Sequence, residues 1–523
     1  MAVKRLRLIG AMLVLCALLA AVVLMGSPYA PVVAPAPQEI ETLWAIEDAR
    51  EESETPLVTV LHNHGMPLAY SEAENRFYCT IGLENGDNWP DIHLTAPGAK
   101  GVSLIFSDDY TYDWCSDAVK DGYGYQILTY TETEFFYTEI VFTGLPIVTL
   151  DTDGEAITAM DTQAKIGMSF FGGQTIDSPG RVHVRGDRSV TWKPKAGYKI
   201  EFTRGGDSGK VLHTVNGLGD VEEAVLLPIA IDNTMMRDRL SWDLVSIAFD
   251  KEEGFGGLPC RYVELFANGS YEGVYLLLHP YDIGDEMRKA GADAVYGDSL
   301  YRVSRLEMAD DRPILPDPTH PEIGFELFYT PDMTRPFDAM KPYVDILTEE
   351  DDEEFVKKAL RHIDLDSLLR YELIMQAGAM VDNASNNLYI WAHNENGNYR
   401  YRFAFWDMDL TWGMYAGDEG ERWVELPIAD RVIALDVGGA KTRIGEIWED
   451  LKARGFTSET VEALIEQYVH ELGDSGAFMR DSERWEKGSF YPDGYEIVDF
   501  AGTRFYMMED WVAQLAQESA AEQ

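Results

Sequence analysis

The stretch "FAFWDMDLTWG" (residues 403–413) places two acids in an otherwise apolar run. If it forms a strand, Asp407 and Asp409 share one face with two phenylalanines, while the other face is fully apolar. Neither face is then plainly solvated. Because a buried, unpaired carboxylate is costly, the pattern predicts a partner for each acid, such as a cation, a metal ion or a hydrogen-bond donor.

A second polar pattern lies upstream, in "VDNASNN" (381–387), at the end of an apolar stretch that predicts a buried helix at 364–380. Asp382 and Asn387 give the spacing D-x-x-x-x-N. Phosphoryl transfer needs an acid to orient or deprotonate the attacking hydroxyl, and it needs oxygen ligands for a metal ion. Asp382 suits the base, whereas Asn387 and Asp407 suit Mg²⁺ (or Mn²⁺), which prefers a few hard oxygen ligands from the protein.

Cations for the phosphates are found in "KPKAGYKIEF" (193–202). Lys195 and Lys199 share one strand parity, opposite Tyr198 and the apolar residues after it. Two lysines on one face, backed by apolar side chains, are placed to reach nucleotide phosphates. The alternative is an ordinary solvated strand face, and these residues alone leave both interpretations open.

The remaining pattern divides the chain near Leu145. Residues 56–143 are rich in β-branched and aromatic side chains and predict a sandwich-like β module. Residues 144–523 mix strands with helices. They include a helix predicted at 233–249 with Asn233 as its cap, and a hairpin predicted at 260–279 across an Asn-Gly turn.

In order along the chain, five segments resemble the spore coat protein H (CotH) kinase family, an atypical secreted branch of the protein-kinase-like fold. They are "VRGDRSVTWKPKAGYKIEF", "LLPIAIDNTMMRDRLSWDL", "RYVELFANGSYEGVYLLLH", "MVDNASNNLYIW" and "FAFWDMDLTWG". The resemblance spans 145–510. It implies an α+β chain with an atypical protein-kinase-like fold and an added β module. It also implies binding of ATP and transfer of the γ-phosphate to Ser/Thr hydroxyls of surface or coat proteins.

The resemblance also implies roles by position. Asp382 matches the catalytic aspartate, and Asp409 supports the metal ligands Asn387 and Asp407. The residues near the nucleotide phosphates are Arg185, Lys195 and Lys199. Asp232 and Arg237 match a loop and helix start whose role in the family is structural.

Departures from the family pattern leave two function classes open. His279 stands where family members commonly place a glutamate after the hairpin, and Ala196 follows Lys195 where paired lysines are frequent. If that glutamate orders a phosphate-binding lysine, His279 weakens nucleotide binding or makes it pH-dependent. The chain is then either an active exported kinase or a degenerate kinase-like scaffold that acts as a surface binding protein.

Residues 1–27 have the features of an export signal: three basic residues precede the apolar run at 8–25. The run exceeds the usual signal core and reaches the ~18 residues of a spanning helix. We expect an uncleaved N-terminal anchor with its positive end in the cytoplasm, while cleavage and secretion stay open. A Pro-rich and acidic linker is expected at 28–55.

The net charge limits the classes of binding partner, and the cysteine spacing limits the kinds of cysteine site. A net charge of -47 argues against nucleic acid or an anionic membrane surface as the partner. The absence of CxxC spacing excludes a zinc ribbon or thioredoxin-like site. Cys79 and Cys115 either pair or remain free thiols, and His62 and His64 are expected to be a strand-end pair rather than a metal site.

Overall fold

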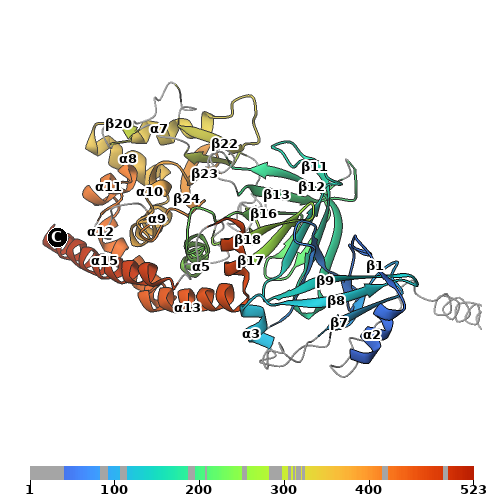
Figure 1. The fold of residues 1–523 in the computed structure, drawn as a ribbon. Helices are drawn as coiled ribbons and strands as arrows, with labels where there is room; N and C mark the ends of the chain where they lie inside the picture. Colours follow the sequence, from blue (N-terminus) through green and yellow to red (C-terminus); the bar gives the residue numbers. More distant parts are fainter. Residues whose placement is uncertain are drawn as a thin grey trace, which may run out of the picture.

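The computed structural model describes most of the chain beyond its N-terminal segment. The described residues are 40–82, 92–105, 115–186, 195–206, 209–249, 256–281, 297–303, 308–309, 312–313, 320, 324–414, 422–486 and 493–522. Figure 1 shows two parts, with the β-rich N-terminal half on one side and most of the helices on the other. The chain is α+β, as predicted.

The N-terminal module holds two sheets that share one apolar core, to which Leu61, Phe77 and Ile127 belong. Its six-stranded sheet comprises β1 (Glu51–Glu52), β4 (Ala69–Ser71), β5 (Arg76–Thr80), β7 (Gly101–Ile105), β8 (Gly124–Tyr130) and β9 (Glu134–Thr143). Its three-stranded sheet comprises β2 (His62–Asn63), β3 (Met66–Pro67) and β6 (Leu94–Thr95). The helices of this module are α2 (Ile40–Asp48) and α3 (Cys115–Lys120). Residues from Ile40 onward, within the expected linker, therefore fold onto this sheet, since β1 pairs with β9.

A closed seven-stranded barrel follows the module. In spatial order its strands are β10 (Ile147–Asp151), β11 (Thr162–Ser169), β12 (Thr175–Arg185), β13 (Gly197–Phe202), β16 (Glu223–Leu227), β18 (Ser270–Leu278) and β17 (Cys260–Ala267). The predicted hairpin is confirmed as β17 and β18. Its turn residues Asn268 and Gly269 both have positive φ, 47° and 70°, as the tight turn between two antiparallel strands requires. Short elements near the barrel are η2 (Phe171–Gly173), β14 (His213–Val215) and β15 (Gly219–Val221).

The module is bonded directly to the barrel. Thr80 donates to the carbonyl of Leu145 at 2.8 Å, and the Glu72 amide donates to the carbonyl of Gly269 at 3.0 Å. Apolar side chains of both parts pack in one cluster that includes Tyr78 and Phe266. Figure 1 shows the six-stranded sheet of the module directly beneath the barrel.

The other half of the chain combines a four-stranded sheet with helices. The sheet runs β22 (Phe325–Tyr329), β19 (Ser299–Val303), β23 (Leu388–Glu395) and β24 (Asn398–Phe405). The helices and short elements are α5 (Arg237–Ala248), β20 (Met308–Ala309), β21 (Arg312–Pro313), η3 (Asp338–Met340), α7 (Lys341–Leu347), α8 (Asp352–His362), α9 (Leu365–Ala377), α10 (Val381–Ser385), α11 (Pro427–Ala434), α12 (Ala440–Ala453), α13 (Ser458–Asp474), α14 (Ala477–Arg484) and α15 (Tyr495–Glu522).

Two predicted helices can be compared directly with the structure. The buried helix is confirmed as α9, and the Asp364 side chain caps it by accepting the Ser367 amide at 3.2 Å. The helix predicted from Asn233 begins instead at Arg237. The reason is Asp232, whose carboxylate accepts the amides of Met236 and Arg237 at 2.9 Å each and so takes the capping position expected of Asn233.

The structure tests two smaller predictions, on the cysteines and the histidines, whereas the predicted anchor lies outside the described residues. Cys79 and Cys115 are free, and burial raises the pKa of Cys79 to about 12. No helix among the described residues is long and apolar enough to cross a membrane, and the apolar run at 8–25 lies outside them. His62 begins strand β2 and His64 directly follows that strand, so the two lie at a strand end, as predicted. The His64 ring lies 5.6 Å from that of His93.

Candidate active site

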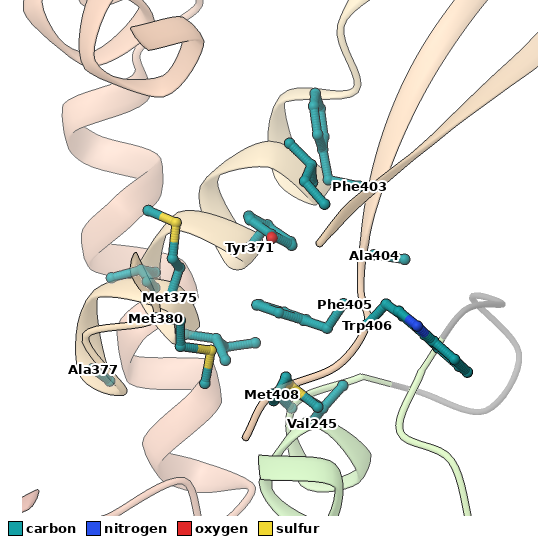
Figure 2. Close-up of a cluster of buried hydrophobic side chains, with 14 of the residues drawn as sticks. Val245, Tyr371, Met375, Ala377, Met380, Phe403, Ala404, Phe405, Trp406 and Met408 are labelled. Carbon is teal, nitrogen blue, oxygen red and sulfur yellow. The ribbon is translucent and has the colours of Figure 1, made fainter. Parts of the chain in front are cut away.

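The acids of the quoted stretch lie in a loop, not in a strand. β24 ends at Phe405, whose ring stacks on Tyr371 of α9 with the centroids 4.1 Å apart. Figure 2 shows Phe405 directed toward Tyr371, Met375 and Met380, while Trp406 points away from them. Asp407 then adopts a left-handed backbone with φ 53°, which aspartate tolerates better than most residues. The predicted strand alternation therefore stops at Phe405, before either acid.

Helix α5 holds this loop in place. The Met408 amide donates to Oδ1 of Asp238 at 3.3 Å, and the indole N–H of Trp412 donates to Ser241 at 3.0 Å. Thr411 donates to the carbonyl of Met408 at 2.8 Å, which closes the loop on itself. These contacts fix the backbone that directly follows Asp407.

The D-x-x-x-x-N pair lies beside that loop. Asp382 is the second residue of the short helix α10, and its Oδ2 accepts from Nδ2 of Asn387 at 2.6 Å. The same amide nitrogen lies 3.4 Å from the backbone carbonyl of Asp407. Asn383 ties the two segments further by donating to the carbonyl of Trp406 at 2.8 Å. The structure therefore brings together Asp382, Asn387 and Asp407, which the sequence predicted to act as a unit.

The donor set suits a magnesium ion. Because the Asn387 nitrogen is engaged with Asp382, the amide oxygen is the atom left to bind a cation. Within the described residues, no group of three or more His, Cys, Asp or Glu side chains is placed to share a metal. A site of one carboxylate and one amide oxygen, completed by phosphates and water, is the small protein contribution that Mg²⁺ commonly uses.

Mutual repulsion among the acids also favours a cation. Burial raises the pKa of Asp407, and the nearby guanidiniums of Arg185 and Arg302 oppose that rise. Burial raises the pKa of Asp409 well above its usual value, and the charges of Asp407 and Asp238 add to the shift. Burial, followed by the charge of Asp407, raises the pKa of Asp238 to about 7.

Asp238 was missed from the sequence. An acid in the first turn of a helix is ordinary, because it complements the helix dipole, so its position in "MMRDRLSW" carried no signal. Its neighbour Arg237 has the structural role expected of it. The guanidinium donates to Asp232 at 2.5 Å and to Glu496 of α15 at 2.6 Å.

Arg185, which the resemblance assigns to the nucleotide phosphates, lies beside the loop that carries Asp407. It ends β12, and its guanidinium stands 5.3 Å from the ring centroid of Trp406. Burial lowers the pKa of this arginine, and the Asp407 charge opposes that effect. Lys199 is on the same face of the barrel wall, because the register pairs Arg185 with Gly197 and His183 with Lys199. Its ammonium pairs with Glu223 at 3.0 Å.

The prediction that Lys195 shares a strand face with Lys199 is wrong. β13 begins at Gly197, so Lys195 precedes the strand, and its side chain is only 1% exposed. Its ammonium lies 2.5 Å from Asp481 of α14 and 2.5 Å from the carbonyl of Val274. It also stands 4.7 Å from the ring centroid of Tyr275. A carboxylate that the sequence could not identify thus orients this lysine, so a glutamate in place of His279 is not required for it.

Lys195→Met is expected to destabilise the protein by about 3–5 kcal/mol, because it leaves the buried Asp481 carboxylate without its cation. The change in free energy of unfolding is measured by urea titration. Lys199→Met is the matched control, since its partly exposed pair with Glu223 predicts a loss below about 1 kcal/mol. Equal losses in the two variants would show that the Lys195–Asp481 pair adds nothing beyond a surface contact.

The residues of the candidate site fall within a match to a known protein family. Residues 182–513 match the family described as CotH kinase protein, and the match contains Arg185, Asp382, Asn387 and Asp407. A search among curated proteins found no match. The family match covers more than half of the 523 residues. The chain therefore belongs to the CotH kinase protein family.

Proposed function

We propose that this chain is an atypical protein kinase that transfers the γ-phosphate of ATP to Ser/Thr hydroxyls of surface or coat proteins. One observation carries the proposal. The Asn387 amide joins the Asp382 carboxylate to the backbone of Asp407, within a chain of the CotH kinase family. In this proposal the barrel and the helical half correspond to the two lobes of a kinase-like fold, with the site between β12 and the loop after β24.

Asp382 acts on the substrate hydroxyl. Its carboxylate is held by Asn387 at 2.6 Å and is only half-buried, so a hydroxyl can approach it. As the hydroxyl oxygen bonds to the γ-phosphorus, the bond from phosphorus to the bridging oxygen of ADP breaks. The hydroxyl proton passes to Asp382, and ADP is the leaving group.

Asn387 and Asp407 would hold the metal ion, with Asp409 as a supporting acid. Bound Mg²⁺ or Mn²⁺ neutralises charge on the ATP phosphates. The fixed left-handed backbone of Asp407 and its anchors on α5 keep its carboxylate in position before nucleotide arrives. Such preorganisation avoids reorganising the site during the reaction.

Arg185 is the cation best placed for the phosphates. It has both an aromatic support in Trp406 and a charge interaction with Asp407. Lys199 lies on the same face, whereas the Lys195 ammonium is buried against Asp481. The proposed setting is extracytoplasmic, with residues 1–27 as anchor or cleaved signal.

A binding protein on a kinase-like scaffold is the second candidate. The observation that favours it is Lys195, whose ammonium is buried against Asp481 and Val274 rather than presented to solvent. A scaffold of this kind would keep the Asp382–Asn387 contact for structural reasons and would not turn over ATP.

Incubation with γ-³²P-ATP and Mg²⁺ or Mn²⁺ is expected to label the wild-type protein or an added protein substrate, and EDTA is expected to abolish the label. Labelling is measured by gel autoradiography after removal of free nucleotide. No label with either metal, together with no nucleotide-induced change in melting temperature, would favour the scaffold.

A further inference from the structure

A second arginine stands beside the candidate site, on a strand that no sequence motif marked. Arg302 lies in β19, directly across from Tyr389 of β23. Its guanidinium is 5.7 Å from the ring centroid of Phe328 and donates to Glu326 at 2.5 Å. Both of these partners belong to the neighbouring edge strand β22.

An aromatic row links Arg302 to Arg185. The Tyr389 ring lies 4.8 Å from that of Phe328 and 5.8 Å from that of Trp406, and Trp406 supports Arg185. The two guanidiniums therefore contact the two ends of the same row of rings. This arrangement brings a residue of the four-stranded sheet and a residue of the barrel to one site.

The charges of the two arginines act on each other. Burial lowers the pKa of Arg185, and the nearby charge of Arg302 adds to that decrease. Two cations that repel each other across a partly desolvated site are stabilised by an anion between them. Asp407 supplies part of that charge, but it is also the proposed metal ligand.

Arg302 also has unused hydrogen-bonding capacity. Among the described residues, its buried Nε has no hydrogen-bond partner, whereas its Nη2 is held by the Glu326 carboxylate. Glu326 is 48% exposed, so it can turn into solvent at little cost. Release of Glu326 would free a guanidinium edge for a bidentate contact to phosphate oxygens, the geometry that favours arginine over lysine.

We propose that Arg302 is a further phosphate-binding residue of the nucleotide site and that the Glu326 carboxylate occupies its guanidinium until ATP arrives. The inference rests on the proposed function, because it assigns a residue to the same nucleotide. The ligand chemistry is the polyphosphate of a nucleoside triphosphate, and the adenine and ribose make no contribution at Arg302.

Binding of Mg·ATP and of adenosine to the full-length protein tests this assignment by titration. Arg302→Met is expected to weaken Mg·ATP binding by about 10- to 100-fold, the range for losing a hydrogen bond to a charged group, and to leave adenosine unchanged. Glu326→Gln is expected to strengthen Mg·ATP binding several-fold, because it removes the competing carboxylate.

Arg402→Met is the matched control. Arg402 lies on the same sheet, donates to Asp364 at 3.0 Å and stands 5.0 Å from the ring centroid of Trp391, so it repeats the carboxylate and aromatic contacts of Arg302. It is expected to leave Mg·ATP binding unchanged. Melting curves check that each variant folds, and Arg302→Lys replaces Arg302→Met if the latter does not. The lysine variant is expected to bind Mg·ATP several-fold more weakly, through loss of the planar fork.

The opposite signs of the two changes separate binding from structure. If Arg302 only packs against Glu326, both variants break the same pair and shift Mg·ATP binding in the same direction or not at all, which overturns the inference. If the wild type binds Mg·ATP and the Arg302 variant binds it equally well, the assignment of Arg302 is overturned while the proposed function stands. A wild type that binds no Mg·ATP overturns the proposed function, and the assignment of Arg302 falls with it.

Discussion

Asp382→Ala is expected to lower the rate of phosphoryl transfer by about 10²–10⁴-fold while the protein stays folded. The substitution removes the group that orients the substrate hydroxyl and accepts its proton. The side chain is half-buried and bonds to Asn386 and Asn387, which directly follow α10, so we expect its removal to open no core cavity. The rate is measured as transfer of labelled phosphate to substrate at saturating Mg·ATP.

Asp364→Ala is the control for that experiment. Asp364 caps α9 on the same half of the molecule, and its loss is expected to cost about 0.5–2 kcal/mol of stability with little change in rate. The two variants therefore predict opposite patterns: one loses rate and keeps stability, and the other does the reverse. If Asp382→Ala lost stability and Mg·ATP affinity in proportion to its rate, Asp382 would be a structural residue and not the base.

Asp407→Ala is expected to abolish the Mg²⁺-dependent stabilisation of the protein by ATP. A ligand that binds only the folded state at 100 times its Kd stabilises it by about 2.7 kcal/mol, which is readily seen as a rise in melting temperature. The wild type should show that rise only with ATP and Mg²⁺ together. The variant lacks the carboxylate that would bind the metal, so adding Mg²⁺ to ATP should have little effect.

The backbone of Asp407 requires a matched control, because replacing a left-handed aspartate by alanine adds strain by itself. Asp436 provides it: it has a positive φ of 45°, is half-buried, and accepts the Lys441 amide at 2.9 Å, outside the candidate site. Asp436→Ala should lower the melting temperature of the free protein yet keep the full Mg·ATP shift. Equal shifts in the wild type and Asp407→Ala would rule out Asp407 as the metal ligand.

Local sequence determined several elements of this protein. The hairpin at 260–279 follows from Asn268 and Gly269, which accept positive φ at low cost. Helix α9 follows from its apolar run and from Asp364, which caps it three residues before the amide it accepts. The contact between Asp382 and Asn387 is also short-range: α10 ends at Ser385, and the non-helical backbone of Asn386, with φ −140°, turns Asn387 back so that its amide donates to the Asp382 carbonyl and its side chain to the Asp382 carboxylate.

The surroundings of the predicted residues were decided by tertiary structure alone. Asp481 is 286 residues from Lys195 in the sequence, and Asp238 is 170 residues from the Met408 amide it holds. No local pattern marks either acid, because their partners reach them only when the barrel, α5 and α14 pack together. The same holds for Arg302, which an ordinary strand carries to the aromatic row beside Arg185.

The acids of "FAFWDMDLTWG" depend on both local sequence and tertiary structure. Their position in an apolar run was enough to predict that they need partners, because desolvation of a carboxylate is costly in any fold. Which partners they have depended on where β24 ends and on the left-handed turn at Asp407. That turn is stabilised by Asp238 and Asn383, residues of other segments, so its geometry is a property of the packed molecule rather than of the stretch itself.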